Sequence, residues 1–154
     1  MTAVIQRVLK AEVYADNEFS GKAENGLFIL LGVRRGDTEN DALLLAEKIS
    51  KLRIFTDEND KMNLSIKDID GEALVVSNFT LSANYSHGNR PDFLDAAPPA
   101  EANALYEHFV ALLRERVRHV GTGRFGAEMK IEASCDGPIT IVMESEKLKK
   151  GKLL

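Results

Sequence analysis

Strand-like and helix-like segments alternate along this chain, and their order limits the folds it can adopt. Short β-branched or apolar runs occupy residues 3–14, 27–31 and 72–79, and two more lie near 128–135 and 139–144. One amphipathic helix is predicted after Thr38, where Asp41 completes a capping-box spacing, and a second after Pro98-Pro99. This order predicts an α+β domain with two main helices and a mixed or mostly antiparallel sheet.

The chain has the size of one domain. Its 154 residues are 44% hydrophobic and 29% charged, which is typical of a globular domain that buries its own core. We therefore expect a single domain over residues 1–145. Residues 146–154 are rich in lysine and are expected to form a short basic tail that frays.

The cysteine, histidine and N-terminal patterns exclude several classes of protein. The single cysteine, Cys135, allows neither an internal disulfide nor a Cys-rich zinc site, and the three histidines lack a ligand spacing. We therefore expect no metal and no cofactor. Arg7 and Lys10 interrupt what would be the apolar part of a signal peptide, and no run is long enough to span a membrane. A cytoplasmic protein without a membrane partner is expected.

Polar residues follow a buried strand in the stretch "VVSNFTL". Ser77, Asn78 and Thr80 stand where a strand packed on both faces would carry apolar side chains. They either bond to nearby backbone, as paired strand residues do, or face a site. Hydroxyl nucleophiles need a base, and the nearest histidine, His87, lies in an irregular loop with nothing evident to orient it.

Two further stretches each allow an ordinary and a functional interpretation. "CDGPIT" is typical of a hairpin turn between two strands, although Gly137-Pro138 would also offer unshielded carbonyl groups to a substrate. "GTGRFG" follows a helix instead of a strand, which favours a turn over a nucleotide-binding loop. The basic residues of 114–130 and of the tail fit either a solvated surface or phosphate contacts, because the net charge of −4 gives no overall attraction to nucleic acid.

Taken together, the motifs resemble one family. "SNFTL" and "DGPIT", with "IQRV", "LLGV", "RIF", "KMNLS", "RP" and "GRF" in the same order, make the chain similar to the D-aminoacyl-tRNA deacylases from Ile5 to about Met143. The family's first motif usually has Gln where this chain has Asn78. Its second motif usually has Asn and Val at the positions of Cys135 and Ile139.

The resemblance implies a barrel-like fold and a homodimer whose active site lies at the interface. It implies hydrolysis of the ester that joins a D-amino acid, and often glycine, to the 3′-terminal adenosine of tRNA. Gly137-Pro138 would be cis and would enter the partner's pocket, where main-chain atoms exclude an L side chain. Ser77, Phe79 and Thr80 would be the catalytic residues. The residues expected to bind the substrate are Asn78, Phe125, Met129, Gly137, Pro138 and Thr140.

In this interpretation the absence of a base has a chemical explanation. The ribose 2′-hydroxyl of the substrate would activate the water, backbone amides near Phe79 and Thr80 would stabilise the oxyanion, and Thr80 would position the substrate without attacking it. Two rival hypotheses remain. One is a nucleic-acid-binding module of the same fold that has lost catalysis, suggested by Asn78, Cys135 and the basic tail. The other is a Thr-dependent esterase that uses His87.

Overall fold

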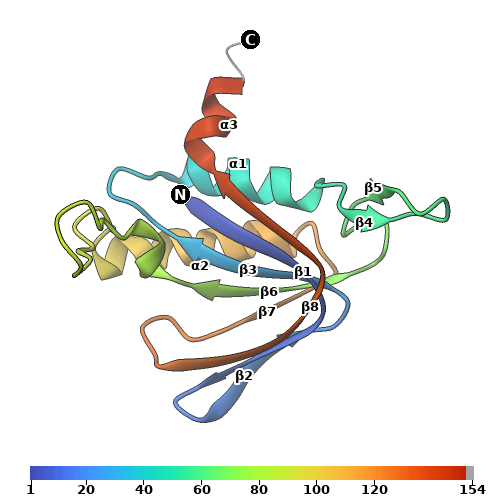
Figure 1. Ribbon diagram of the computed structural model, residues 1–154, viewed down its shortest axis with the longest axis horizontal. Coiled ribbons are helices and arrows are strands. Elements are labelled where there is room, and N and C mark those ends of the chain that lie inside the picture. The colour runs from blue at the N-terminus through green and yellow to red at the C-terminus, as the bar shows by residue number, and fades with distance from the viewer. Residues whose placement is uncertain (152–154) are drawn as a thin grey trace.

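The computed structural model describes residues 1–151, which form a mixed β-sheet covered by helices (Figure 1). None of the helices in this range is long and apolar enough to cross a bilayer. The elements in chain order are β1 (Thr2–Ala15), β2 (Glu18–Ala23), β3 (Gly26–Gly32), α1 (Glu39–Ser50), β4 (Phe55–Thr56), β5 (Met62–Leu64), β6 (Glu72–Ser77), the 3₁₀ helix η1 (Phe79–Ser82), α2 (Pro99–Arg114), β7 (His119–Thr122), β8 (Met129–Glu144) and α3 (Ser145–Gly151).

The long strand β1 organises the sheet. One of its edges pairs antiparallel with β3 over residues 2–8 and with β2 over residues 11–15, and its other edge pairs antiparallel with β8. β3, β6 and β7 then run parallel to one another, so the sheet is mixed, as predicted. Asp16 and Asn17 turn the chain between β1 and β2 with positive φ angles of 48° and 66°, which short polar residues tolerate.

Two glycines bring the ends of the sheet together. A Cβ on Gly21 of β2 would lie 2.5 Å from the carbonyl oxygen of Thr122, and one on Gly121 of β7 would lie 2.4 Å from that of Lys22. Only residues without a side chain allow this approach of β2 and β7. The hydroxyl of Ser20 also donates to the carbonyl of Thr122 at 2.9 Å. The sheet therefore curls into a nearly closed barrel, which confirms the predicted fold.

The core has two parts. The larger lies between the sheet and the helices α1 and α2, which cover the same face; Phe109, Leu113, Ile49 and Leu45 are fully buried there. The smaller lies inside the curled part of the sheet around Val13, Leu74 and Val76. Burial of a large apolar side chain contributes roughly 1.5–3 kcal/mol, so these layers hold the helices and the barrel together.

β8 differs from the prediction of two strands joined by a hairpin turn. Both halves of β8 pair with β1 in the same direction, from Met129 opposite Ala15 to Glu144 opposite Thr2, so the chain does not reverse at "DGP". Between the Cys135–Val8 and Thr140–Gln6 pairs, four residues of β8 face one of β1, and the register shifts there. Continuous pairing with one long neighbour overrides the local turn signal, and Gly137-Pro138 lies in a bulge of a single strand.

Three other local predictions are wrong. "GTGRFG" is not all turn, because its first two residues end β7, which pairs with β6. The strand predicted to reach Phe79 ends at Ser77. Residues 145–151 do not fray but form α3. Residues 152–154 of the predicted tail lie outside the described residues.

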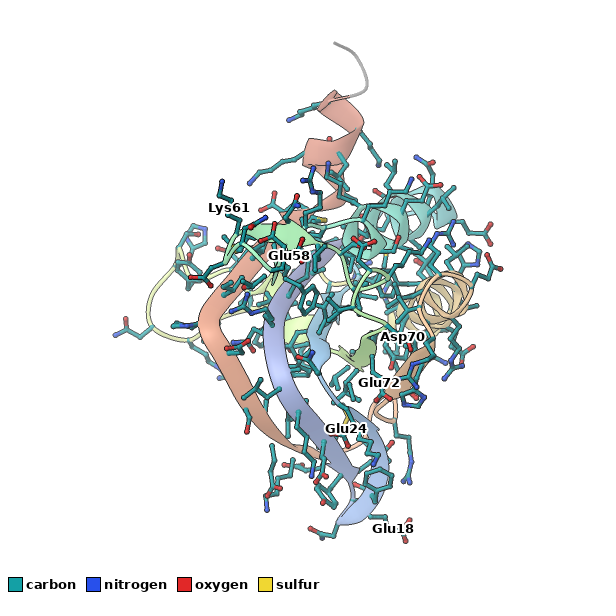
Figure 2. The ribbon with its side chains drawn as sticks, turned by 90° about the vertical axis from the view of Figure 1, so that its right-hand side faces the viewer. Glu18, Glu24, Glu58, Lys61, Asp70 and Glu72 are labelled. Carbon is teal, nitrogen blue, oxygen red and sulfur yellow. The ribbon has the colours of Figure 1, made fainter. Side chains whose placement is uncertain are left out.

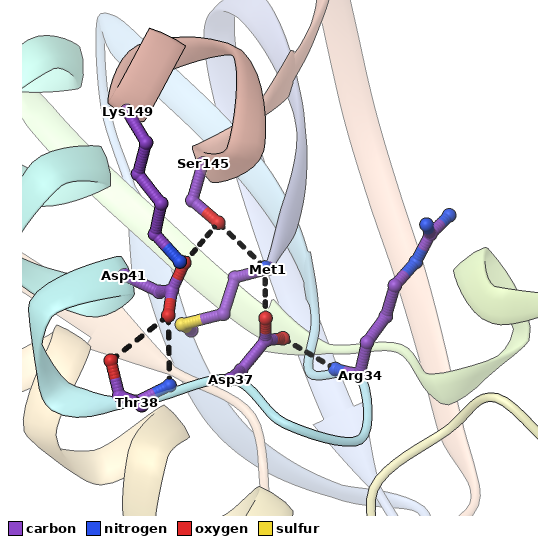
Figure 3. Close-up of polar contacts among 7 residues, drawn as sticks. All are labelled: Met1, Arg34, Asp37, Thr38, Asp41, Ser145 and Lys149. Atoms are coloured by element: carbon purple, nitrogen blue, oxygen red, sulfur yellow. Dashed lines mark hydrogen bonds and ion pairs between the residues drawn. The ribbon is translucent and has the colours of Figure 1, made fainter. Parts of the chain in front are cut away.

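A buried polar network holds α3 against α1 (Figure 3). The hydroxyl of Ser145 donates to Asp41 at 2.7 Å and accepts a hydrogen bond from the amino group of Met1 at 2.8 Å. Lys149 lies 2.8 Å from Asp41, whose other oxygen accepts hydrogen bonds from the backbone amide and hydroxyl of Thr38. The sequence signal of the Thr38/Asp41 capping pair is thus confirmed, and Asp41 has a second role that local spacing does not reveal.

Candidate functional site

A cavity of about 580 Å³ opens where the parallel strands β3 and β6 end. Ligands of sheets with parallel strands often bind outside the carboxyl ends of the strands, because the chain leaves the sheet there and loops form walls. Leu31 lies near the end of β3 and Val33 follows this strand. Ser77 ends β6, and the start of α2 with the β7–β8 connection completes the enclosure. The lining is mostly apolar, with a few polar groups that can orient a ligand.

Asn78 explains why the strand becomes polar at this point. Its amide donates to the carbonyl of Leu31 at 2.8 Å, the last bond to β3, and its side chain then caps η1. The Asn78 Oδ1 atom accepts hydrogen bonds from the amide of Thr80 at 3.2 Å and from the Thr80 hydroxyl at 2.5 Å. Asn is among the favoured caps because its oxygen satisfies free amides of a helix start. Thr80 is therefore not a strand residue.

Aromatic side chains form the rim beside η1. Phe79 is 58% exposed, and its ring meets that of Phe93 edge to face with centroids 5.1 Å apart. Arg35 also lines the cavity, and its guanidinium donates to the carbonyl of Leu94 at 2.7 Å, which ties the long loop before α2 to the β3–α1 connection. The rim thus combines a flat apolar surface with one cation.

Phe125 and Met129 form the opposite wall. The Phe125 ring lies 6.1 Å from that of Tyr106 on α2, and the Tyr106 hydroxyl donates to the carbonyl of Val75 at 2.9 Å. Burial raises the pKa of Tyr106 to about 12, so this hydroxyl stays protonated and keeps its bond to β6. The bond fixes α2 against the strand that carries Ser77.

Gly137, Pro138 and Thr140 lie elsewhere on the chain. They belong to β8, whose bulge is exposed, and they do not line the cavity. The Gly137–Pro138 peptide bond is cis, as the resemblance implied, and Gly137 has a φ of 124°. Thr140 faces Gln6 of β1, which donates to its hydroxyl at 3.5 Å.

Arg7 of β1 contacts the bulge of β8 through Asp136, the residue before Gly137. Its guanidinium lies 3.0 Å from the carboxylate of Asp136 and donates to the carbonyl of Ile54 at 2.9 Å, so it links β1, β8 and the start of β4. The motif "IQRV" contains Arg7, but the motif does not indicate which distant residues this side chain contacts. An arginine in an otherwise apolar run is the only hint that the sequence offers.

The structure brings together five of the predicted site residues and separates the others. Ser77, Asn78, Phe79, Phe125 and Met129 line one cavity, although almost fifty residues divide its two walls in sequence. Thr80 lies beside them on η1. Sequence reasoning missed some residues of the lining because their segments carry no motif; they are Arg35, Phe93, Ala97, Pro98 and Ala102.

The hydroxyl of Thr80 is bonded to Asn78, and within residues 1–151 no hydrogen bond joins it to His87, which lies on the exposed loop that follows η1. A hydroxyl nucleophile would need such a base. The cavity can therefore orient a ligand by backbone and amide groups and cover it with apolar rings.

Proteins of known family share this sequence and this fold. The family model described as D-Tyr-tRNA(Tyr) deacylase matches residues 4–144. A protein of Thermotoga petrophila named D-aminoacyl-tRNA deacylase is 51% identical over 148 residues, which are 96% of this chain and 99% of that protein. One of Geobacter metallireducens with the same name is 50% identical over 147 residues, 96% of this chain and 97% of the relative.

Solved structures share the fold of this chain. A protein described as c-Myc DNA Unwinding Element Binding Protein superposes with a TM-score of 0.87 at 38% identity, over 94% of this chain and 98% of the other. A probable eukaryotic D-amino acid tRNA deacylase superposes with a TM-score of 0.78 over 94% and 100% of the two chains; at 16% identity it supports the fold alone. Because the family model spans almost the whole chain and relatives share half of its residues, this chain belongs to the D-Tyr-tRNA(Tyr) deacylase family.

Proposed function

We propose that this protein hydrolyses the ester bond of D-aminoacyl-tRNA. Water adds to the ester carbonyl, the bond from the carbonyl carbon to the ribose oxygen breaks, and that oxygen takes the proton, which releases a free D-amino acid and tRNA. The observation that carries the proposal is the cavity built from Ser77, Asn78 and Phe79 in a chain half identical to named D-aminoacyl-tRNA deacylases. The cytoplasm, where tRNA is charged, is where such an activity is needed.

The cavity suits the 3′-terminal adenosine and its ester. Its volume of about 580 Å³ and its apolar walls fit a nucleoside, with Phe125 and Met129 on one side and Phe79 on the other. The amide of Thr80 already bonds to the Asn78 side chain, which leaves the amide of Phe79 as the donor that we propose for the developing oxyanion. Ser77, at the end of β6, would hold the ester group.

Thr80 acts as a positioning residue in this proposal. Its hydroxyl donates to Asn78 and thereby shapes η1, so it does not need a base of its own. The 2′-hydroxyl of the substrate's ribose would activate the attacking water. A protein cavity without a paired base is compatible with such assistance by the substrate.

Gly137 and Pro138 are proposed to select the D enantiomer from the neighbouring subunit of a homodimer. They are exposed and lie outside the cavity of their own chain, so they would have to reach the cavity of a second copy. Main-chain atoms placed there would bind the α-amino group and exclude an L side chain, while a D side chain points outward. Glycine, which has no side chain to exclude, would also be cleaved.

A mixing experiment tests this arrangement. A Gly137→Val variant would keep its own cavity but lack the selector, and an Ala97→Phe variant would keep the selector but fill its cavity. Each homodimer should be inactive. Mixed dimers should regain part of the wild-type rate if the two parts act across subunits, whereas a mixture that stays inactive would contradict the trans arrangement.

The activity itself is tested with D-Tyr-tRNA and L-Tyr-tRNA in parallel, with a chelator present. Loss of the D-tyrosyl group alone is the expected result. Equal loss of both forms would contradict selection by Gly137 and Pro138, and loss of neither would contradict the proposed hydrolysis.

A second candidate function is nucleic-acid binding without turnover. It is favoured by the likeness to a protein described as binding a DNA unwinding element and by the exposed lysines of α3. Under this alternative, Lys147→Gln and Lys150→Gln together would weaken RNA binding and flatten its salt dependence by roughly 0.7 per lost contact to a single strand. Rapid hydrolysis of D-Tyr-tRNA would contradict it.

A further inference from the structure

A second cavity of about 430 Å³ lies between α2 and the β7–β8 connection. Its walls include Glu107, Val110 and Arg114 from the helix and Arg124 and Phe125 from the connection. Nothing in the proposed reaction uses this cavity. Its mixture of two cations, one carboxylate and two aromatic rings differs from the mostly apolar lining of the cavity proposed for the terminal adenosine.

The helix contributes two charged residues to this cavity, with an apolar residue between them. Glu107 and Arg114 are seven residues apart, so they share one face of α2 and are separated by roughly 10 Å along its axis. Val110 lies between them on that face. The carboxylate of Glu107 and the guanidinium of Arg114 thus belong to two ends of the same cavity wall.

Phe125 joins the two cavities, because it lines both. Arg124, the residue before it, is half exposed, and its ion pairs within residues 1–151 are long, 3.4 Å to Asp16 and 3.7 Å to Glu18. Exposed pairs of this kind contribute little to stability, so the guanidinium can turn to an incoming phosphate at small cost. A strand that ends in the first cavity and passes over Phe125 would meet Arg124 first and then α2.

We propose that this second cavity binds the cytidine that precedes the terminal adenosine of tRNA, with its phosphates on Arg124 and Arg114. The inference rests on the proposed function, because it assumes that the terminal adenosine occupies the first cavity. The ring of Phe125 offers a surface on which a base can stack.

Glu107 provides a reason for a cytosine at this position. Its exposed carboxylate can accept a hydrogen bond from the exocyclic N4 amino group, which is the pairing that acidic side chains make with cytosine. Uracil carries an oxygen there and would face the carboxylate with a second acceptor. All tRNAs share this cytidine, so the contact would bind the substrate class without distinguishing its members.

The opposite flank of the molecule provides the control. Figure 2 shows the side chains of Glu24, Asp70 and Glu72 on the flank that faces away from η1. Arg118 lies among these acids, 3.2 Å from Asp70 and 3.0 Å from Glu72, and it lines neither cavity. An Arg118→Gln variant therefore removes one arginine of this chain from a place where a phosphate would meet negative charge.

The first experiment compares D-Tyr-tRNA with D-tyrosyl-adenosine, a short ester that lacks the cytidine. The kcat/KM for tRNA relative to that for the short ester should fall roughly tenfold in Arg114→Gln and in Arg124→Gln, since each loses one charge-assisted contact. The salt dependence of KM for tRNA should become shallower by about 0.7 for each substitution. Arg118→Gln should leave both quantities at the wild-type values. An unchanged ratio in both cavity variants would overturn the proposal.

The second experiment exchanges the base. Wild-type protein should prefer D-Tyr-tRNA with cytidine over a tRNA with uridine at the penultimate position. Glu107→Gln, whose amide can donate to the uracil oxygen, should remove or invert this preference. A preference that is the same in wild type and Glu107→Gln would show that the carboxylate does not read the base.

Binding to a labelled RNA oligonucleotide ending in CCA separates this inference from the proposed function. If the protein hydrolyses neither ester, the proposed function is wrong. Weaker oligonucleotide binding by Arg114→Gln and Arg124→Gln would then still support the second cavity as an RNA-binding site, provided that Arg118→Gln binds like the wild type. If hydrolysis is rapid and oligonucleotide binding is equal in all three variants, the proposed role of the second cavity is wrong, and the proposed function is not affected.

Discussion

The guanidinium of Arg7 lies 3.0 Å from the carboxylate of Asp136, so a residue of β1 holds the segment of β8 that leads into Gly137. The same side chain donates to the carbonyl of Ile54 and is only 12% exposed. Asp136 is 38% exposed, so the ion pair is shielded from solvent on the arginine side. This pair keeps the Gly137-Pro138 bulge in one position relative to the sheet.

Replacing this arginine should loosen the bulge. Arg7→Met keeps the length of the side chain but leaves Asp136 and the Ile54 carbonyl unpaired, which should lower the free energy of unfolding by about 1–3 kcal/mol. The ratio of D-Tyr-tRNA to L-Tyr-tRNA hydrolysis should fall roughly tenfold, for a change of about 1.4 kcal/mol. The control is Lys10→Met on the same strand, whose partner is Glu12 and whose side chain is 52% exposed. Equal discrimination in both variants would contradict the role of Arg7.

Gly137 should not accept a side chain. A Cβ there would lie 2.8 Å from the Ile139 nitrogen and 3.0 Å from its Cγ1 atom, and the φ of 124° already disfavours other residues. Gly137→Val should therefore abolish hydrolysis of D-Tyr-tRNA. Gly36→Ala controls for backbone strain, because Gly36 also has a positive φ of 86° but an added Cβ meets no atom within 4 Å. It should lose about 1–2 kcal/mol of stability and remain active. Full activity of Gly137→Val would contradict the proposed selector.

The Thr80 hydroxyl should make a modest contribution to the rate of hydrolysis. Thr80→Ala removes the hydroxyl that donates to Asn78, but the Thr80 amide still bonds to the same oxygen, so η1 keeps its start. We expect kcat to fall by less than about tenfold, as suits the loss of one hydrogen bond of roughly 1 kcal/mol. Thr80→Ser, which retains the hydroxyl, should be close to wild type. Complete loss of activity in Thr80→Ala with an intact fold would indicate a nucleophile instead.

His87 should be dispensable. A threonine-dependent esterase would need a base within hydrogen-bond reach of its hydroxyl, and the Thr80 hydroxyl bonds to Asn78 instead. His87→Ala should therefore leave kcat for D-Tyr-tRNA unchanged across neutral pH. A large loss of kcat in His87→Ala with an intact fold would restore the esterase hypothesis.

Asp41 should make the attachment of α3 sensitive to acid (Figure 3). Burial alone would raise the pKa of this carboxyl, but the hydrogen bonds from Lys149, Ser145 and Thr38 outweigh it and hold the pKa well below the usual range. A lowered pKa in the folded state stabilises the protein above the ordinary carboxyl pKa, near 3.9, and this contribution is lost as the pH falls below about 5.

The test is the free energy of unfolding as a function of pH. Asp41→Asn should be less stable than wild type by about 1–3 kcal/mol at neutral pH and should lose less stability on acidification. Glu146→Gln, an exposed change on α3, should follow the wild-type curve. Identical acid sensitivity of Asp41→Asn and wild type would contradict this account.

The elements with a strong local signal follow from the sequence. The Thr38/Asp41 spacing marks the start of α1, because the side chain that caps a helix lies within one turn of it. Asp16 and Asn17 predict the β1–β2 turn because they tolerate positive φ. The motifs around Ser77 and Gly137 predict the family, and through it the barrel-like fold, without any knowledge of contacts.

Only the tertiary structure decided which of these residues meet. The sequence alone determined that "SNF" and Phe125 are candidates; the parallel pairing of β3 with β6 and the packing of α2 place them around one cavity. The sequence also predicts a turn at "DGP". β1 pairs with residues on both sides of this stretch, so β8 is one continuous strand. The reason is physical: caps and turns depend on neighbours within a few residues, whereas strand pairing and cavities depend on hydrogen bonds and packing between distant segments, which no local pattern records.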